Sequence, residues 1–195
     1  ADCEIRYLCG GGCRARAYFA TGDVEARDPY CALMRTFYRL LFEALGKDTD
    51  PQKANEIYEK ELAKQGRLLS GAREALERLY GKVRLFIASN GTVDVQNGRI
   101  NNTGIGKYFE KAFFSEKIGF EKPDKRFFDA CFAQIPNFKK ENAVIIGDSL
   151  SSDILGGKNA GITTVWLNKS GDGSPLADMT LKNISEAADA VIKGL

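Results

Sequence analysis

From about residue 36 onward, apolar and polar positions alternate between helical spacing and short strand-like runs. Apolar residues three and four positions apart predict helices, and short runs rich in β-branched residues predict buried strands. These patterns predict helices over residues 37–45, 51–65, 72–80, 123–134, 151–160 and 185–192, and strands over residues 83–88, 111–114, 143–147, 163–167 and 177–181. Because strands that alternate with helices form parallel sheets covered on both faces, the predicted fold class is α/β.

Residues 1–35 do not share this pattern and form an irregular, cysteine-rich segment. Four of the five cysteines of the chain lie there: Cys3, Cys9, Cys13 and Cys31. Such clustering indicates a local cysteine site. The fifth cysteine, Cys131, lies at helical spacing with several phenylalanines, which favours packing in the core. The chain has no histidine, so imidazole-based catalysis and histidine-ligated zinc are excluded.

The composition places the chain among globular proteins. Its 195 residues are 44% hydrophobic and 28% charged, which predicts one soluble domain, or one domain with a small appendage. The net charge of +2 gives no reason to expect nucleic acid or a membrane surface as a partner. No apolar run approaches the ~20 residues of a membrane span, and no signal-peptide pattern opens the chain. We therefore expect a cytoplasmic protein.

Two polar clusters in the chain are suited to binding a phosphate. Ser89, Asn90 and Gly91 follow an apolar strand, where a hydroxyl and backbone N–H groups can hold a phosphate; an ordinary turn is the alternative. Lys122 comes directly before Pro123, which is well placed to begin a helix. A lysine fixed at that point can neutralise phosphoryl charge, whereas the alternative is a solvated surface lysine.

A third cluster is acidic and follows the most apolar strand of the sequence. Asp148 comes directly after that strand, and Asp153 lies five residues later in the first turn of the next predicted helix. Two carboxylates at this spacing can converge on Mg²⁺, a cation that prefers oxygen ligands. The alternative for Asp153 is a helix N-terminal charge favoured by the helix dipole.

Taken together and in this order, Ser89, Lys122 and the pair Asp148 and Asp153 resemble the second, third and fourth motifs of haloacid-dehalogenase-like phosphohydrolases. The Ser-Asn-Gly turn, the Glu-Lys-Pro-Asp stretch and the Thr-Val-Trp-Leu-Asn strand are most similar to the pyrimidine 5′-nucleotidase branch of that superfamily. The resemblance covers residues 36–195.

The resemblance implies a Rossmann-like parallel sheet with helices on both faces over residues 71–195. A partial helical cap would occupy residues 36–70. It also implies a Mg²⁺-dependent phosphatase of small phosphorylated metabolites, here nucleoside monophosphates. The implied roles are metal coordination by Asp148 with support from Asp153, and binding of the phosphoryl group by Ser89, Asn90 and Gly91, with its charge offset by Lys122.

One motif of the superfamily is missing. Members begin with Asp-x-Asp-x-Thr, in which the first aspartate is the nucleophile and the second is the acid–base, and residues 1–195 do not contain it. The run Asp48-Thr49-Asp50 lies between two predicted helices, and Asp23-Val24-Glu25 is only a loose match. We therefore expect poor or no phosphatase activity from residues 1–195.

The N-terminal segment resembles a different protein. The spacing of Cys3, Cys9, Cys13 and Cys31 is similar to the end of the auxiliary iron–sulfur (SPASM) domain of radical-SAM maturases. That resemblance implies thiolate ligands for a [4Fe–4S] cluster, with four free thiols as the alternative. The competing functional hypothesis is therefore a non-enzymatic iron–sulfur remnant, residues 1–35, fused to a passenger α/β domain.

Because this motif is missing, the strand that would carry it is missing too, and one strand position in the predicted sheet is unfilled. In the superfamily its strand lies between the strands that here are predicted over residues 83–88 and 143–147. Residues 16–20 could insert there, the two strands could pair directly, or a gap could remain, with marginal stability and self-association through open edges. We expect direct pairing or a gap rather than insertion.

Overall fold

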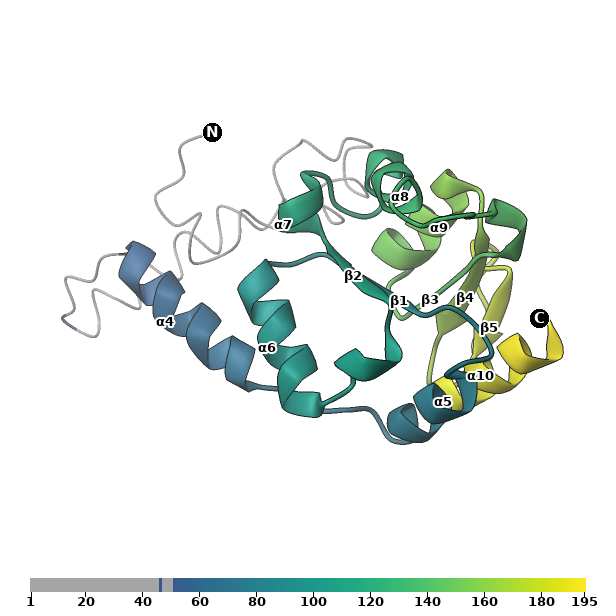
Figure 1. Cartoon of the computed structure of the whole chain (residues 1–195), viewed down its shortest axis with the longest axis horizontal. Coiled ribbons are helices and arrows are strands. Elements are labelled where there is room, and N and C mark those ends of the chain that lie inside the picture. The colour runs from purple at the N-terminus through teal and green to yellow at the C-terminus, as the bar shows by residue number, and fades with distance from the viewer. Residues whose placement is uncertain (1–45, 47–50) are drawn as a thin grey trace. The chain divides into compact units, whose positions relative to one another are not determined.

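The computed structural model describes residue 46 and residues 51–195 (Figure 1). The chain divides into two compact units, Ala1–Leu62 and Ala63–Leu195. The predicted helix over residues 37–45, the strand candidate over residues 16–20 and the four N-terminal cysteines lie outside the described residues. Within the described part, no helix is both long enough and apolar enough to cross a membrane.

The described part is an α/β fold whose order of elements matches the sequence pattern. The strands are β1 (Phe86–Ser89), β2 (Lys111–Phe114), β3 (Val144–Gly147), β4 (Thr163–Leu167) and β5 (Met179–Leu181). The helices are α4 (Pro51–Lys64), α5 (Ala72–Leu79), α6 (Val93–Thr103), α7 (Ser115–Ile118), α8 (Lys125–Phe132), α9 (Leu155–Ala160) and α10 (Ile184–Lys193). The predicted strands and helices from residue 51 onward are confirmed, with ends that differ by a few residues.

Helix α6 was not predicted, because its sequence has only a few widely spaced apolar residues. Its N-cap is Thr92, and it ends at Gly104, which adopts the left-handed backbone conformation (φ 66°) that glycine tolerates best. Val95 is the buried residue of this helix. A polar helix of this kind gives too weak an apolar pattern to be recognised from sequence alone.

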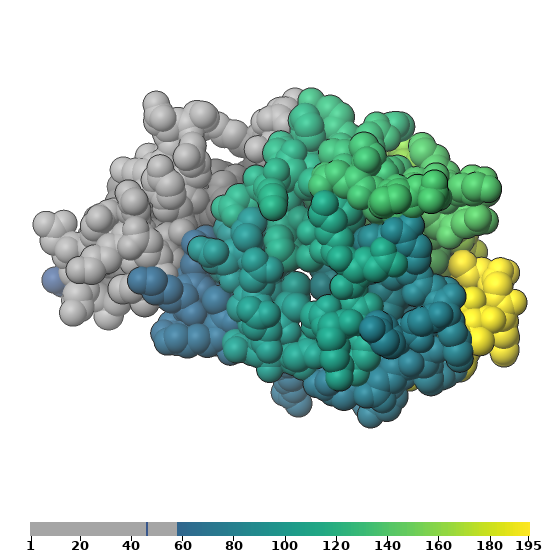
Figure 2. Space-filling view, viewed as in Figure 1, coloured from purple at the N-terminus to yellow at the C-terminus, as the bar shows by residue number. Residues whose placement is uncertain are grey.

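The strands form two parallel sheets, β1–β2 and β3–β4–β5. The predicted direct pairing of the strands now labelled β1 and β3 is therefore wrong. Every residue of β1 and of β3 is half-buried, whereas Thr164 and Val165 in β4 are fully buried. Figure 2 shows narrow openings among the teal residues, the part of the chain that contains β1 and β2.

A side chain, rather than a backbone ladder, joins the ends of β1 and β3. Paired strands lie about 4.8 Å apart. Here the ammonium group of Lys122 is hydrogen-bonded both to the carbonyl oxygen of Ala88 in β1 and to Asp153, which follows β3. Among the described residues, neither β1 nor β3 has a strand partner on its other edge. Direct pairing is thus not observed, and the expected gap stays a prediction, because residues 16–20, the candidate for insertion, lie outside the described residues.

Helices cover both faces of β3–β4–β5, as expected (Figure 1). On one side, α8 and α9 contribute to a core cluster with Phe113 of β2. The buried members of this cluster are Phe113, Phe127, Phe128, Cys131, Ala160 and Ile162. On the other side, α5 packs against α10 through Ala75, Leu79 and Ala188. The predicted core position of Cys131 is confirmed, and burial raises the pKa of its thiol to about 12.

A carboxylate fixes the start of β5 against β4. Asp178 accepts hydrogen bonds from the backbone N–H of Thr164 at 2.9 Å and from its hydroxyl at 2.8 Å, and it forms an ion pair with Lys158. Thr164 is fully buried. The hydrogen bond from the Lys158 ammonium is the main reason that the pKa of Asp178 lies below its ordinary value, and the bonds from Thr164 lower it further.

This contact predicts a pH-dependent part of the stability. The pKa of Asp178 is lower in the folded than in the unfolded state. The contribution of Asp178 to the free energy of unfolding is therefore fully present above the unfolded-state pKa of about 3.9, and it is lost as pH falls through the folded-state pKa. Asp178→Asn should therefore lower the free energy of unfolding at pH 7, and its difference from the wild type should shrink below about pH 4. Urea titrations at pH 7, 4 and 3 measure this difference. A difference that stays constant over this range would contradict the assignment.

Candidate phosphate and metal site

Three segments bring the predicted site residues to the carboxyl ends of β1 and β3. Ser89 is the last residue of β1, and Lys122 lies in the segment between α7 and α8. Asp148 directly follows β3, and Asp153 lies in the turn after it. The Lys122 ammonium donates to the Ala88 carbonyl oxygen and to Asp153 Oδ1, both at 2.6 Å. One side chain therefore links the ends of the two sheets.

The ion pair between Lys122 and Asp153 is buried. Lys122 is 7% exposed and Asp153 is 8% exposed. A solvated surface lysine and an isolated helix charge, the two alternatives left open by the sequence, therefore do not describe these residues. A buried charge needs a partner and further hydrogen bonds, and here each charge has both.

The turn after β3 places Asp153 for these contacts. Residues Leu150–Ile154 form a π-helical turn, in which the Ile154 N–H donates to the Ser149 carbonyl oxygen at 3.1 Å. The second carboxylate oxygen of Asp153 accepts from the Ser149 N–H at 3.2 Å. The sequence predicted an ordinary α-helical first turn here. Short π-helical turns are frequent at functional sites.

Asp148 differs from Asp153 because it is exposed. Its backbone carbonyl oxygen accepts a hydrogen bond from the indole Nε1 of Trp166 at 3.0 Å, which fixes the main chain at the end of β3. Among the described residues, no hydrogen bond joins Lys122 to Asp148; the lysine pairs with Asp153 instead. Of the two carboxylates, Asp148 is therefore the one that is exposed to solvent.

The loop after β1 is bound to two neighbouring segments. The Gly91 N–H donates to Ser115 Oγ at 3.0 Å, and the Val93 N–H donates to Glu116 at 2.8 Å, so the start of α7 holds this loop. The side chain of Asn90 is bonded to the backbone of Lys122. Ser89, the predicted phosphate ligand, is half-buried at the end of the strand.

Two residues of this region were missed by sequence reasoning. Asn159 in α9 donates from Nδ2 to the Pro123 carbonyl oxygen at 3.0 Å, and so holds the residue after Lys122. Trp166 holds Asp148 as described above. The sequence contains no local signal for either contact, because the partners lie 36 and 18 positions apart.

The described residues contain no group of three or more side chains of the kinds that bind metals. Mg²⁺ does not require such a group, because it keeps several waters and is often held by one or two carboxylates together with phosphate oxygens. The exposed carboxylate of Asp148 fits that pattern. Asp153 accepts one of the described hydrogen bonds at each carboxylate oxygen, and each oxygen has a second lone pair, so both direct coordination of a metal and support from outside the ligand shell fit these contacts.

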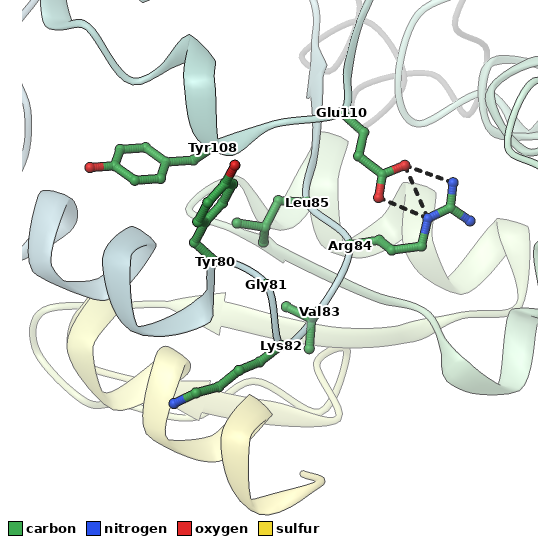
Figure 3. A pocket seen from close by; sticks show the side chains of 8 residues that line it. All are labelled: Tyr80, Gly81, Lys82, Val83, Arg84, Leu85, Tyr108 and Glu110. Atoms are coloured by element: carbon green, nitrogen blue, oxygen red, sulfur yellow. Dashed lines mark hydrogen bonds and ion pairs between the residues drawn. The ribbon is translucent and has the colours of Figure 1, made fainter.

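A separate pocket of about 460 Å³ lies before the amino end of β1 (Figure 3). Its lining includes Tyr80, Leu85 and Tyr108, and its charged residues Arg84 and Glu110 pair with each other. This ion pair raises the pKa of Arg84 and lowers that of Glu110, chiefly through the side-chain hydrogen bond. The pocket is at the opposite end of β1 from Ser89, so it is not the predicted phosphate site.

Parallel strands with a lysine and two aspartates at their carboxyl ends define an α/β protein, and in open α/β sheets this is the edge at which ligands generally bind. The haloacid dehalogenase-like hydrolase family matches residues 28–167. The chain belongs to this family. The match includes Cys31, which was assigned above to the N-terminal iron–sulfur segment; that assignment stays a prediction.

Similar proteins include two bacterial nucleotidases. The chain is 40% identical over 137 residues to the pyrimidine 5′-nucleotidase PynA of Streptococcus pneumoniae, covering 70% of this chain and 58% of that protein. It is 36% identical over 121 residues to the pyrimidine 5′-nucleotidase YjjG of Escherichia coli, covering 62% of this chain and 54% of that protein. The chain therefore spans a little over half the length of these relatives.

A solved structure shares the fold. The crystal structure of the putative HAD-hydrolase YfnB from Bacillus subtilis, bound to magnesium, matches with a TM-score of 0.74 and 30% identity. The match covers 91% of this chain and 77% of that one. The predicted Rossmann-like α/β fold is thereby confirmed.

Proposed function

We propose that the ends of β1 and β3 form the phosphate- and magnesium-binding part of a phosphohydrolase that acts on nucleoside monophosphates. The observation that carries the proposal is the buried ammonium group of Lys122, held between the Ala88 carbonyl oxygen and Asp153. A fixed cation at the carboxyl ends of parallel strands is suited to a phosphoryl group. The names of the relatives PynA and YjjG support a pyrimidine nucleotide as the substrate.

Each site residue has a role in this proposal. The Ser89 hydroxyl binds a phosphoryl oxygen, and Lys122 offsets the charge of the group. The Gly91 N–H serves the phosphate only if it exchanges its present partner, Ser115. Asp148 holds Mg²⁺, which when bound would neutralise phosphate charge and polarise the phosphoryl oxygens. Asp153 keeps Lys122 in place and supports Asp148 from the same turn.

The proposal includes weak or absent turnover by residues 1–195. A positioned nucleophile and a general acid each contribute orders of magnitude to the rate. The Asp-x-Asp-x-Thr motif, to which the resemblance assigns both roles, is absent from residues 1–195. The chain would therefore bind substrate without hydrolysing it at a useful rate.

A phosphate-release assay with UMP and Mg²⁺ tests this part of the proposal. We expect no release above the level of the Asp148→Asn variant. Release that survives Asp23→Asn but disappears with Asp148→Asn would reveal a nucleophile elsewhere in the chain. Release lost with Asp23→Asn would show that the loose Asp23-Val24-Glu25 match is the working motif. Both of these results would overturn the expectation of inactivity.

A further inference from the structure

The side-chain amide of Asn90 pairs with both backbone polar groups of Lys122. Asn90 Oδ1 accepts from the Lys122 N–H at 2.8 Å, and Asn90 Nδ2 donates to the Lys122 carbonyl oxygen at 2.8 Å. The two residues are 32 positions apart in the sequence. A planar amide that makes both bonds to one residue fixes the position and the orientation of that residue's backbone.

Residues at and just after the end of β1 therefore bind Lys122 at two points, its ammonium group and its backbone. Ala88 accepts a bond from the lysine ammonium, and Asn90, two residues later, holds the lysine backbone. Asn159 of α9 holds the next residue, Pro123, from another direction. The ammonium group meets Asp153 because its backbone starts from this fixed point.

This arrangement gives the Asn90 side chain a role of its own. The sequence predicted a phosphate contact through the backbone N–H groups around Asn90 and Gly91, and it assigned no role to the Asn90 side chain. Its side-chain oxygen and nitrogen are both already bonded to the Lys122 backbone. Oδ1 is an acceptor and does not bind a phosphate oxygen, whereas Nδ2 has two hydrogens, of which the Lys122 carbonyl oxygen engages one. The two bonds to the Lys122 backbone therefore stand independently of any phosphate contact.

We propose that Asn90 is a positioning residue that sets the location of the Lys122 ammonium group at the phosphate site. This role acts through the backbone of Lys122 and does not require contact with substrate. That this position of the ammonium group serves phosphate binding rests on the proposed function. The effect of Asn90 on the position of Lys122 can be measured without any substrate.

The first arm of the test measures the accessibility of the Lys122 amine. Acetylation by N-hydroxysuccinimidyl acetate is followed by peptide mass spectrometry in the wild type, Asn90→Ala and Asn90→Asp, with the exposed Lys125 as the internal reference. In the wild type Lys122 should react slowly, because it is buried and paired. In both variants its rate relative to Lys125 should rise about tenfold, because local opening becomes easier.

A control separates positioning from general destabilisation. Asn97→Ala changes an exposed asparagine of α6 and should leave the Lys122 rate unchanged. Circular dichroism shows whether each variant is folded, and urea denaturation measures its global stability. If Asn90→Ala does not fold, Asn90→Asp decides the outcome, because it keeps the size of the side chain. An unchanged Lys122 rate in a folded variant would overturn the proposal.

The second arm measures UMP binding with Mg²⁺ by calorimetry. Asn90→Ala should weaken binding about tenfold, and Asn97→Ala should not. If the wild type binds no UMP, the proposed function fails while the acetylation arm still decides the role of Asn90. If Lys122 becomes reactive but UMP affinity stays the same, Asn90 holds the loop without serving the phosphate site, and the proposal is overturned.

Discussion

Lys122→Met should lower the free energy of unfolding by about 3–5 kcal/mol. The substitution keeps most of the side-chain volume but leaves the buried carboxylate of Asp153 without its charged partner. Removing one member of a buried ion pair is strongly destabilising because the other charge stays buried without compensation. The bond to the Ala88 carbonyl oxygen is lost as well. Urea denaturation at pH 7 measures the change.

A neighbouring lysine supplies the matched control for this prediction. Lys125 pairs with Asp129 four residues later, and both side chains are about half exposed. Lys125→Met should therefore change the free energy of unfolding by less than about 1 kcal/mol. The double variant Lys122→Met/Asp153→Asn should recover part of the loss, because no unpaired charge remains. Equal effects of Lys122→Met and Lys125→Met would show that the Lys122 pair is not buried.

Gly147→Ala should destabilise the protein by at least about 1–3 kcal/mol and abolish UMP binding. A Cβ at position 147 would lie closer than 3.0 Å to the Asp153 side chain, a separation that real Cβ atoms essentially never show. The backbone at position 147 does not have a positive φ, so the effect comes from the collision and not from backbone strain. Overpacking of this kind displaces neighbouring groups, and here the displaced group is the partner of Lys122.

Gly173→Ala is the control for Gly147→Ala. A Cβ at Gly173 would meet nothing within 4 Å, and its φ is not positive either. Its effect on unfolding should stay within about 0.5 kcal/mol. Thermal and urea denaturation of the two variants give the comparison. A neutral Gly147→Ala would mean that Asp153 does not lie beneath the end of β3.

The sequence predicted the strands and the order of the site residues well, because both depend on local pattern. Runs such as Val144–Gly147 are short, apolar and β-branched, and a residue at the carboxyl end of such a strand must face the ligand side of the sheet. The expectation that Pro123 begins a helix is wrong, because α8 begins at Lys125 with Asp124 as its N-cap. Lys122 nevertheless lies at the strand ends, where it contacts Ala88 and Asp153.

The partners of these residues could not be predicted, because they depend on tertiary packing. Asp153 binds a lysine 31 positions earlier, and Asn90 binds a backbone 32 positions later. The separation of β1 from β3 also could not be predicted from the sequence. The apolar pattern of the strands is compatible with direct pairing and with a gap, and it contains no information about the distance between the two sheets.

The most direct test of the proposed site is a calorimetric titration with UMP, with and without Mg²⁺. The wild type, Asp148→Asn and the exposed-loop control Asp172→Asn are compared. The account predicts saturable, Mg²⁺-dependent binding to the wild type and to Asp172→Asn. Binding to Asp148→Asn should be at least about tenfold weaker, as expected when a metal-held charge contact is lost. Equal affinity of Asp148→Asn and the wild type in the presence of Mg²⁺ would contradict the account.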